Sequence, residues 1–382
     1  MSAVATGDAR ELRGAMVDQL KKRGLEFEPA IEEAFRRIPR EAFLPDVPLE
    51  RVYSGDAIPT KRDADGNPIS SSSEVGIMIA MARLLDVAPG QRILEIGAGT
   101  GYNAAVLSQL VGEGGAITTV DIDAGVAAQA REHLARAGFD RVAVITADGW
   151  QGNAGNAPYD RVEVTASVSD LSPDWLAQLV DGGKIVLPFL LPAGMQAVLG
   201  LRKNGADLVS TNVIPGGFMR LRGPGGAQPS VRTFDGLSVE LGDGVADRSE
   251  VLGSLLRQRP RFVVAPPLGW EALILLALLY GNVTATRKGH AGLAVGIFDP
   301  EGGLALAELA SGSIAGSHSL VIGYGSDAAQ SRLHSAIEDL RTVRLKDLQI
   351  VVRPTGAPEP GGDMVVRRRS FTLAFRVARS AL

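Results

Sequence analysis

The sequence predicts an α/β fold, a Rossmann-like sheet with helices on both faces, followed by a smaller C-terminal α+β domain. Short apolar stretches alternate with helical ones between residues 92 and 187, which is typical of parallel strands joined by crossover helices. A glycine-rich turn connects the first of these strands to its helix. Beyond residue 223, strand-like stretches dominate, and this change in character indicates a second domain.

The N-terminal region comes before this alternation. Residues 10–45 are expected to be helical, because apolar residues recur there at three- and four-residue steps. Residues 61–73 are polar and rich in turn formers, which predicts a loop. An amphipathic helix should then run from Glu74 to Leu85, and Pro89 and Gly90 follow its end.

The alternating region supplies the main sheet. We expect five strands and three helices between them, and strands separated by helices run parallel. The strands are at residues 92–96, 116–120, 142–145, 160–164 and 184–187, and the helices are at 102–110, 126–137 and 175–179.

Residues 223–229 (GPGGAQP) are a linker candidate. They divide the chain into a domain of residues 1–224 and a C-terminal domain of residues 225–382. The second domain mixes strand-like stretches with one clear helix at 328–340, and none of its motifs carries recognisable chemistry. The basic run at 367–369 fits a solvated strand edge better than a nucleic-acid patch.

Composition excludes several classes of function. The 382 residues are 45% hydrophobic and 21% charged, with a net charge of −4, so neither nucleic acid nor an anionic membrane is expected as a partner. The longest apolar run, Ala272–Tyr280, is far shorter than the ~20 residues of a bilayer span, and no export signal opens the chain, which predicts a cytoplasmic protein. There is no cysteine, and the four histidines lack metal-ligand spacing, so no metal is predicted.

The motif that carries chemistry is the turn with Gly97, Gly99 and Gly101, between a strand and a helix. Glycines there let a ligand approach the backbone at the carboxyl end of a strand, where the helix N-terminus offers free N–H groups. Residues 99–104 also satisfy the looser dinucleotide pattern G-x-G-x-x-A. A dinucleotide-dependent oxidoreductase is therefore a distant alternative.

Three acidic residues favour a different ligand. Glu95 precedes the first glycine, Asp121 ends the next strand, and Asp148 follows the strand after that. Carboxylates in these places suit a nucleoside with a positive centre and no phosphates, and S-adenosylmethionine fits that description. The plain alternatives are a surface strand residue for Glu95, a helix N-cap for Asp121 and a turn former for Asp148.

Taken together, these motifs resemble the protein-L-isoaspartate O-methyltransferase family, in order over roughly residues 10–223. The resemblance rests on IPREAFLP (38–45), EIGAGTGY (95–102), ADG (147–149), APYD (157–160) and GFMRL (217–221, like the last family strand). It implies a Rossmann-like methyltransferase sheet, carboxyl O-methylation and contacts to S-adenosylmethionine. The implied cofactor contacts are Glu95, Gly97, Gly99, Gly101, Asp121, Asp148 and Gly149.

The resemblance also implies a functional serine in the polar loop. A gapless alignment backward from Gly97 selects Ser73, whereas matching the family's Ile-Ser pair selects Ser70. Glu74 replaces the glutamine that the family carries, which argues against tight binding of a substrate carboxylate. Ser73 could alternatively serve as N-cap of the helix that begins at Glu74.

The implied reaction needs no general base, because a carboxyl group of reference pKa ~3.9 is already ionised at neutral pH. In overall layout the chain resembles actinobacterial homologues with a C-terminal extension, which methylate an aspartate of a ribosomally made precursor peptide, so that the ester closes to an aspartimide. We expect that activity, with the C-terminal domain recognising a constrained peptide. Repair of L-isoaspartyl proteins is the main alternative, and a non-catalytic binding module or a nucleic-acid methyltransferase fits less well.

Overall fold

The computed structural model describes residues 4–223, 226, 231–242, 248–287, 293–309 and 318–378. The chain forms two compact units. Unit 1 comprises Met1–Leu187, Gly200–Thr211 and Phe218–Gly226, and unit 2 comprises Pro188–Leu199, Asn212–Gly217 and Ala227–Leu382. The predicted boundary at 224/225 and most of the predicted linker lie outside the described residues, so this division stays a prediction.

The sheet of unit 1 contains the five strands that the sequence predicts. Neighbouring strands are parallel, in the order β5-β4-β3-β6-β7. In chain order this is 3-2-1-4-5, so the order reverses between β3 and β6, and ligands of such sheets bind beyond the carboxyl ends of the strands at that reversal. The strands are β3 (Arg92–Ile96), β4 (Ala116–Asp121), β5 (Ala143–Thr146), β6 (Tyr159–Val164) and β7 (Leu179–Leu190).

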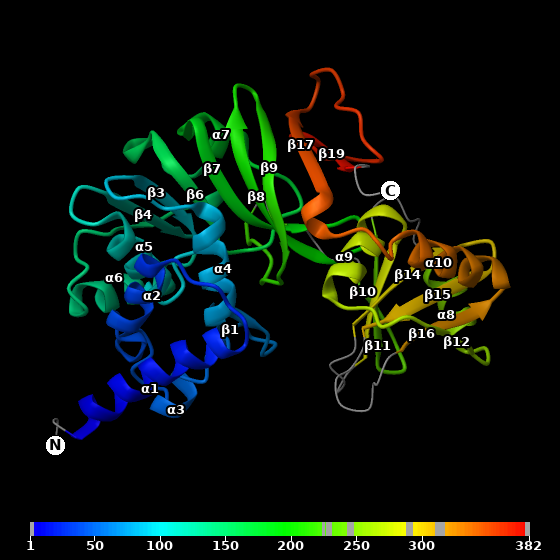
Figure 1. The fold of residues 1–382 in the computed structure, drawn as a ribbon, viewed down its shortest axis with the longest axis horizontal. Helices are drawn as coiled ribbons and strands as arrows, with labels where there is room; N and C mark the ends of the chain where they lie inside the picture. The colour runs from blue at the N-terminus through cyan, green and yellow to red at the C-terminus, as the bar shows by residue number, and fades with distance from the viewer. Residues whose placement is uncertain are drawn as a thin grey trace. The chain divides into compact units, whose positions relative to one another are not determined.

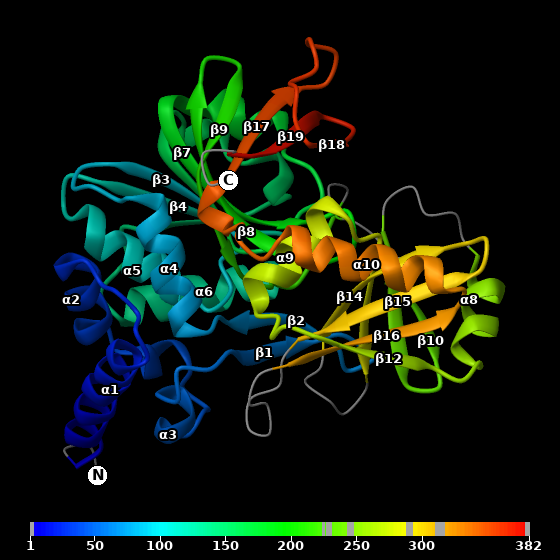
Figure 2. The same ribbon diagram turned by 45° about the vertical axis from the view of Figure 1, so that its right-hand side comes forward.

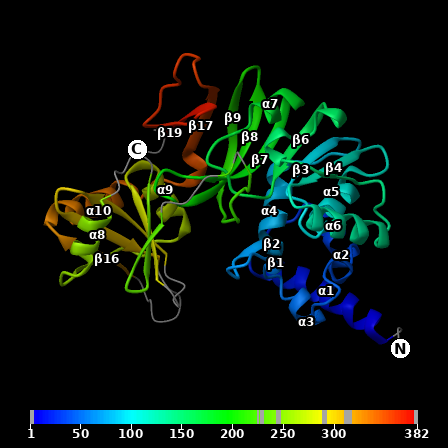
Figure 3. The same ribbon diagram turned by 180° about the vertical axis from the view of Figure 1, so that it is seen from behind.

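Helices cover this sheet and support the turn after β3. Helices α4, α5 and α6 pack on the strands, and α2 packs in turn on α4 and α5 (Figures 1 and 3). The α/β fold class is thereby confirmed. The helices are α1 (Val4–Lys22), α2 (Pro29–Arg37), η1 (Arg40–Phe43), α3 (Leu49–Val52), α4 (Val75–Leu85), α5 (Tyr102–Val111), α6 (Ala124–Arg136), η2 (Gly149–Gln151), η3 (Ala154–Asn156) and α7 (Pro173–Gln178).

The loop predicted for residues 61–73 is wrong. An antiparallel hairpin forms there from β1 (Ile58–Arg62) and β2 (Pro68–Ser72), with Ile58 opposite Ser72. The sequence hides the strands because only small polar side chains, Ser70 and Ser72, are buried on β2, and no apolar alternation marks them. The hairpin carries the serine run.

The strand expected at 217–221 is also wrong. That segment forms only one isolated bridge, between Ser167 and Arg220, because Pro215, Gly216 and Gly217 interrupt the extended pattern that precedes it. Two long strands that the sequence did not indicate occur earlier, β8 (Gln196–Asn204) and β9 (Asp207–Pro215). Together with β7, they contribute residues to both units.

Unit 2 is built on a seven-stranded antiparallel sheet in the order β10-β11-β13-β14-β15-β16-β12. The predicted helix, α10 (Asp327–Asp339), lies across it (Figure 2). The sequence did not indicate α8 (Ser249–Leu256), and the apolar run at 272–280 lies mainly in α9 (Trp270–Leu279). In the described parts of the chain, no helix has the length and apolarity needed to span a membrane. The sheet strands are β10 (Val231–Phe234), β11 (Leu237–Leu241), β12 (Arg261–Ala265), β13 (Val283–Arg287), β14 (Leu293–Asp299), β15 (Gly303–Glu308) and β16 (Ser319–Gly325).

A further three-stranded antiparallel arrangement, β18-β19-β17, completes the unit. Its strands are β17 (Leu348–Pro354), β18 (Met364–Arg367) and β19 (Phe371–Val377). Within the basic run, Arg367 forms an exposed ion pair with Glu359, whereas the Arg368 guanidinium lies over the Phe189 ring, 5.8 Å from its centroid. The prediction of a solvated strand edge therefore fits Arg367, which is exposed, whereas Arg368 is partly buried against Phe189.

Candidate active site

The glycine-rich turn has a backbone that only glycine adopts easily. Gly97 and Gly99 have φ values of 100° and 53°, in the left-handed region that disfavours side chains. A Cβ on Gly97 would approach the Thr165 hydroxyl to 2.3 Å. That hydroxyl is 2.9 Å from the carbonyl oxygens of Ile96 and Gly97. Thr165, which the sequence did not single out by itself, therefore fixes the turn from β6.

Helix α5 begins directly after this turn. Its N-cap is Gly101, which contributes no side-chain hydrogen bond, so the first N–H groups of the helix depend on other partners. A helix N-terminus at the carboxyl end of a strand, next to the reversal of strand order, is a place where polar ligands bind. The predicted position of the ligand turn is therefore supported by the topology.

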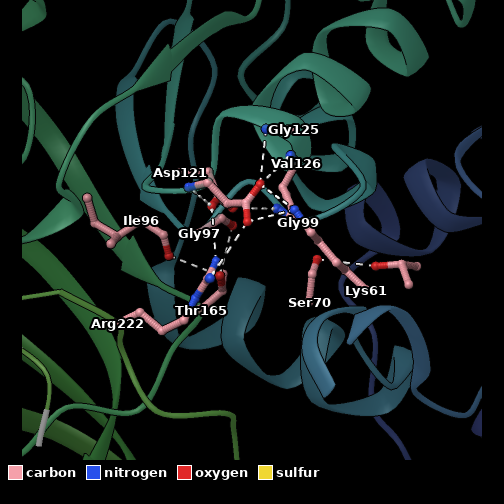
Figure 4. Close-up of polar contacts among 12 residues, drawn as sticks. Lys61, Ser70, Ile96, Gly97, Gly99, Asp121, Gly125, Val126, Thr165 and Arg222 are labelled. Atoms are coloured by element: carbon pink, nitrogen blue, oxygen red, sulfur yellow. Dashed lines mark hydrogen bonds and ion pairs between the residues drawn. The ribbon is translucent and has the colours of Figure 1, made fainter. Parts of the chain in front are cut away.

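Asp121 lies at the end of β4 and faces this turn (Figure 4). It is 9% exposed, and its two carboxylate oxygens accept hydrogen bonds from the N–H groups of Gly99 (3.3 Å) and Asp123 (3.0 Å). The alternative of a helix N-cap is wrong for Asp121, because Asp123 caps α6 by accepting from Gly125 and Val126. Asp121 is thus left to shape the turn, and a carboxylate retains acceptor sites beyond two bonds.

Two cations from distant segments, Lys61 and Arg222, both contact Asp123. Lys61 of β1 contacts both oxygens of Asp123 at 2.8 Å, and Arg222 lies 3.9 Å from Asp121 and 3.7 Å from Asp123 (Figure 4). Hydrogen bonding from Lys61 is the largest cause that lowers the pKa of Asp123. The serine hairpin and the segment around Arg222 are therefore both tied to the loop after β4.

Asp148 and Gly149 form the next loop along the sheet. The Asp148 carboxylate accepts from the Trp150 N–H at 3.0 Å, which agrees with the turn-forming alternative. Gly149 is buried, and its carbonyl oxygen accepts from the Trp175 indole at 2.8 Å. A Cβ on Gly223 would lie 2.9 Å from Ile122 and 3.4 Å from Asp148. The loops after β4 and β5 therefore both lie close to Gly223.

Glu95 is fully buried, at 0% exposure, so the alternative of a surface strand residue is wrong. One of its oxygens accepts from Asn103 at 2.8 Å and the other from Thr119 at 2.5 Å. The same Asn103 amide donates to Glu163, the neighbouring residue on β6, at 2.8 Å. Burial, the largest cause, raises the pKa of Glu95 to about 8 and that of Glu163 to about 7. Glu163 and Asn103 were not identified from the sequence.

The serine run lies against the glycine-rich turn. A Cβ on Gly99 would come within 3.2 Å of the Ser71 carbonyl oxygen. The hydroxyls of Ser70 and Ser72 are buried and engaged, the first by Thr60 at 3.2 Å and the second by Arg40 at 3.3 Å. Ser73 is only half-buried. Ser73 is therefore the more accessible of the two candidate residues.

Helix α4 is capped by Glu74 and not by Ser73. The Glu74 carboxylate accepts from the N–H groups of Gly76 (3.0 Å) and Ile77 (2.8 Å). A negative charge at a helix N-terminus is stabilised by the helix dipole. The cap alternative for Ser73 is thus wrong, and the carboxylate that replaces the family's glutamine is turned into its own helix.

The assembled residues fit S-adenosylmethionine on structural grounds. The turn leaves no room for side chains at Gly97 and Gly99, and Asp121 and Asp148 offer carboxylate oxygens at neighbouring strand ends. Ile122, the residue after Asp121, has an exposed apolar side chain. Glu95 lies beneath the turn and is held by protein groups. The predicted cofactor residues thus gather at one edge of the sheet, with Glu95 buried below and the serine run above the turn.

Comparisons with known proteins agree with this geometry. The family model for protein-L-isoaspartate(D-aspartate) O-methyltransferase matches residues 11–221. A protein-L-isoaspartate O-methyltransferase of Methanothermobacter thermautotrophicus is 35% identical over 195 residues, covering 51% of this chain and 87% of that protein. One of Koribacter versatilis is 35% identical over 219 residues, covering 57% and 94%.

A solved structure titled protein-L-isoaspartate O-methyltransferase extends the likeness of the fold. It covers 96% of this chain and 99% of its own, with a TM-score of 0.55 and 23% sequence identity. The overlap therefore includes most of the C-terminal region, which the two relatives above do not cover. At this identity, the likeness concerns the fold alone.

Proposed function

This chain belongs to the protein-L-isoaspartate(D-aspartate) O-methyltransferase family, and from that premise we propose a site, a mechanism and a substrate for it. It is an S-adenosylmethionine-dependent protein carboxyl methyltransferase. The cofactor supplies an electrophilic methyl group on a positively charged sulfur. We propose that Gly97, Gly99, Gly101 and Gly149 provide its backbone cradle, that Asp121 and Asp148 accept its hydroxyl and amino hydrogens, and that Glu95 supports the turn from below.

The observation that carries the mechanism is the contact of the serine run with the glycine-rich turn, where the Ser71 carbonyl oxygen lies against Gly99. Because the run continues directly to Ser73, a substrate carboxyl group beside Ser73 lies next to the cofactor cradle. The Ser73 hydroxyl would donate to one carboxylate oxygen and leave the other directed at the methyl group. Orientation of this kind contributes up to ~7–11 kcal/mol in favourable intramolecular systems.

The ionised carboxylate attacks by itself, so the site needs no residue to remove a proton. With S-adenosylmethionine bound, an oxygen–carbon bond to the substrate carboxylate would form as the sulfur–carbon bond breaks, and the electron pair would stay with the neutral sulfur. The Glu74 carboxylate, bound to the N–H groups of α4, does not oppose an anionic substrate as strongly as an unpaired carboxylate would.

For the substrate, we propose a side-chain carboxyl group of an aspartyl residue in a ribosomally made precursor peptide. After methylation, the backbone nitrogen of the next residue attacks the ester carbonyl and methanol leaves, which gives an aspartimide. The run from Ser70 to Ser73 and the exchange of glutamine for Glu74 support this choice, because both separate the chain from the family's pattern. The C-terminal region is neutral evidence, since its fold also occurs in the solved structure described above.

The second candidate is methylation of L-isoaspartyl residues for repair. The names of the relatives that match 87–94% of their own length favour it. The capping role of Glu74 favours it as well, because it removes the objection to binding an isoaspartyl α-carboxylate.

A matched pair of peptides separates these candidates. A precursor peptide encoded beside the gene and its isomer with isoaspartate at the same position would be incubated with the enzyme and S-adenosylmethionine and analysed by mass spectrometry. We expect a methyl ester, followed by loss of methanol, on the aspartyl peptide alone. Methylation of the isoaspartyl isomer alone would establish repair instead.

The assignment of the serine is tested in the same assay. Ser73→Ala should lower kcat about 100-fold, as loss of one orienting donor does, while the dissociation constant of S-adenosylmethionine stays nearly unchanged. Ser70→Ala is the matched control, because the Ser70 side chain is buried in the hairpin, whereas Ser73 is half-buried. A loss of kcat in Ser70→Ala without one in Ser73→Ala would transfer the role to Ser70.

A further inference from the structure

Arg40 is a buried cation in a motif whose role the cofactor site leaves unexplained. It stands in η1, directly after Ile38 and Pro39, and is 0% exposed. Within the described residues, no carboxylate lies within ion-pair distance of its guanidinium, and burial lowers its pKa. Burying an unpaired charge is unfavourable, so its contacts must repay that cost.

Those contacts all go to the segments that carry the proposed chemistry. The Nη2 group of Arg40 donates to the backbone carbonyl oxygen of Ser73 at 2.9 Å and to the Ser72 hydroxyl at 3.3 Å. It also reaches the carbonyl oxygen of Asp56 at 3.1 Å, just before the hairpin begins. One nitrogen thus joins both ends of the hairpin.

Arg40 also contacts the helix that follows the glycine-rich turn. Its Cζ lies 5.8 Å from the ring centroid of Tyr102, the first residue of α5 and the neighbour of Gly101. The Tyr102 side chain is itself buried and packs edge-on against Phe43, at a centroid distance of 5.5 Å. Arg40 therefore spans the gap between the serine run and the helix that opens the cofactor cradle.

The residues that follow Ser73 also restrain its backbone. The residue after Ser73 is tied to α4 as its N-cap, and the N–H of Val75 donates to the Gly55 carbonyl oxygen at 2.8 Å. With the Ser73 carbonyl oxygen fixed by Arg40, the backbone on both sides of the hydroxyl is held. Transfer from sulfur to oxygen depends on such alignment, and a misplacement of about 1 Å can cost about 100-fold in rate.

We propose that Arg40 is a positioning residue for methyl transfer: it holds the Ser73 backbone, and with it the serine hydroxyl, at a fixed distance from the glycine-rich turn. This inference rests on the proposed role of Ser73. The remaining donors of Arg40, Nε and Nη1, and the Tyr102 hydroxyl have no hydrogen-bond partner in the described structure. Buried donors without partners are unfavourable, so an apolar side chain would fill this part of the core at a lower free-energy cost. The presence of arginine is therefore consistent with a requirement for geometry and not only for packing.

Three variants of the full chain test the inference, each assayed for kcat, KM, S-adenosylmethionine affinity and thermal unfolding. Arg40→Met keeps the volume and removes the donors, and we expect kcat to fall about 100-fold with an unchanged dissociation constant for the cofactor. Arg40→Lys keeps the charge but reaches fewer acceptors, and we expect a loss of about 10-fold. Arg13→Met is the control for loss of a buried arginine, because Arg13 donates to Arg36 and Tyr53 and forms an ion pair with Glu41 at 3.8 Å, none of which belongs to the serine run; it should lower stability and leave kcat unchanged.

A double-mutant cycle separates positioning from general stability. If Arg40 acts through the serine hydroxyl, Arg40→Met should cost little further kcat in the Ser73→Ala background, whereas a merely structural role would cost the same factor in both. Equal factors, or full kcat in a folded Arg40→Lys enzyme, overturn the inference while the proposed function stands. If Ser73→Ala alone leaves kcat unchanged, the proposed role of the serine fails, and the inference fails with it.

Discussion

The two units of this chain bury different kinds of side chain. Among the described residues, the buried polar side chains of unit 2 are all neutral: Thr284, Ser319, Gln330 and Thr372. Unit 1 buries charged or titratable groups, several of them at the carboxyl edge of its sheet. These are Arg13, Arg40, Glu95, Asp121, His133, Glu163 and Asp170.

This difference indicates which unit carries the chemistry. Burying a charge costs free energy that burying an apolar group does not, so a cluster of buried charges persists where geometry or catalysis requires it. Unit 2 contains an apolar core formed by residues of β11, α8 and β13 to β16, and its helix α9 buries further leucines, of which Leu276 is 0% exposed. The core of unit 2 is explained by stability, whereas Arg40, Glu95, Asp121 and Glu163 of unit 1 lie at or beside the proposed site.

The largest expected effect is a loss of stability caused by a substitution in the core of unit 2. Leu276→Ala removes a fully buried side chain and should destabilise the protein by about 2–5 kcal/mol. At a temperature where the variant is still folded, calorimetry should find the same affinity for S-adenosylmethionine as in the wild type. Weaker cofactor binding by the folded variant would show that the two units are energetically coupled. It would contradict the view that the core of unit 2 serves stability alone.

The next effect concerns the cofactor edge of unit 1. Asp121→Ala should weaken S-adenosylmethionine binding about 100-fold. It removes the carboxylate that we propose accepts two hydrogen bonds from the cofactor, each worth ~1.5–3 kcal/mol, and water replaces them in part. Asp299→Ala is the matched control, because Asp299 also accepts a backbone N–H in a turn, that of Glu301 at 3.0 Å in unit 2. Equal affinities in the two variants would remove Asp121 from the proposed site.

The sequence predicted the glycine-rich turn and the acidic strand ends because local patterns specify them. A strand, three glycines and a helix need only their own neighbours, and Asp121 is the last residue of a strand made mostly of β-branched residues, Ala116–Asp121. The contacts of Asp123 with Lys61 and of Asn103 with Glu163 join residues about 60 positions apart. No spacing rule in a single sequence predicts such pairs.

The serine run shows the same limit. Its four identical residues left Ser70 and Ser73 indistinguishable, because alternation in a strand cannot be read where every side chain is the same. Pairing with β1 buries Ser70 and Ser72 and leaves Ser73 half-buried beyond the end of β2. The hairpin itself escaped prediction, since the buried side chains of β2 are polar.

A pH dependence of stability follows from the buried carboxyl pair. The pKa values of Glu95 and Glu163 are raised above those of the unfolded chain, so the folded state binds more protons between about pH 4.5 and 8. The contribution of these groups is therefore present below pH 4.5 and is lost as pH rises toward 8. Glu163→Gln should reduce this loss and raise the stability at pH 8.5 by at least about 1.4 kcal/mol, the equivalent of one pKa unit.

Denaturant unfolding of the wild type and Glu163→Gln at pH 5.5 and 8.5 measures this difference. Gln330→Leu, which removes a buried neutral amide of unit 2, is the control. It should change the free energy of unfolding by the same amount at both pH values. An unchanged pH slope in Glu163→Gln would mean that the pair is ionised in the folded protein despite its burial.

The smallest expected effect probes the tie between the serine hairpin and the cofactor edge. The Lys61 ammonium is 2.8 Å from both oxygens of Asp123, but its side chain is 40% exposed. Solvent and salt screen such a pair, so Lys61→Met should change the free energy of unfolding by only about 0.5–1 kcal/mol. Lys184→Met, which breaks the 2.8 Å pair with Asp86, should cost about the same.

The two lysine variants should nevertheless differ in catalysis. Lys61 anchors the hairpin that leads to Ser73, whereas Lys184 lies on β7 and pairs with the residue that ends α4. Loosening the hairpin should lower kcat/KM a few-fold in Lys61→Met alone, and raised salt should lower the wild-type value toward that of the variant. Equal kcat/KM in both lysine variants and the wild type, at low salt, would show that Arg40 and the cap of α4 position the serine without the ion pair.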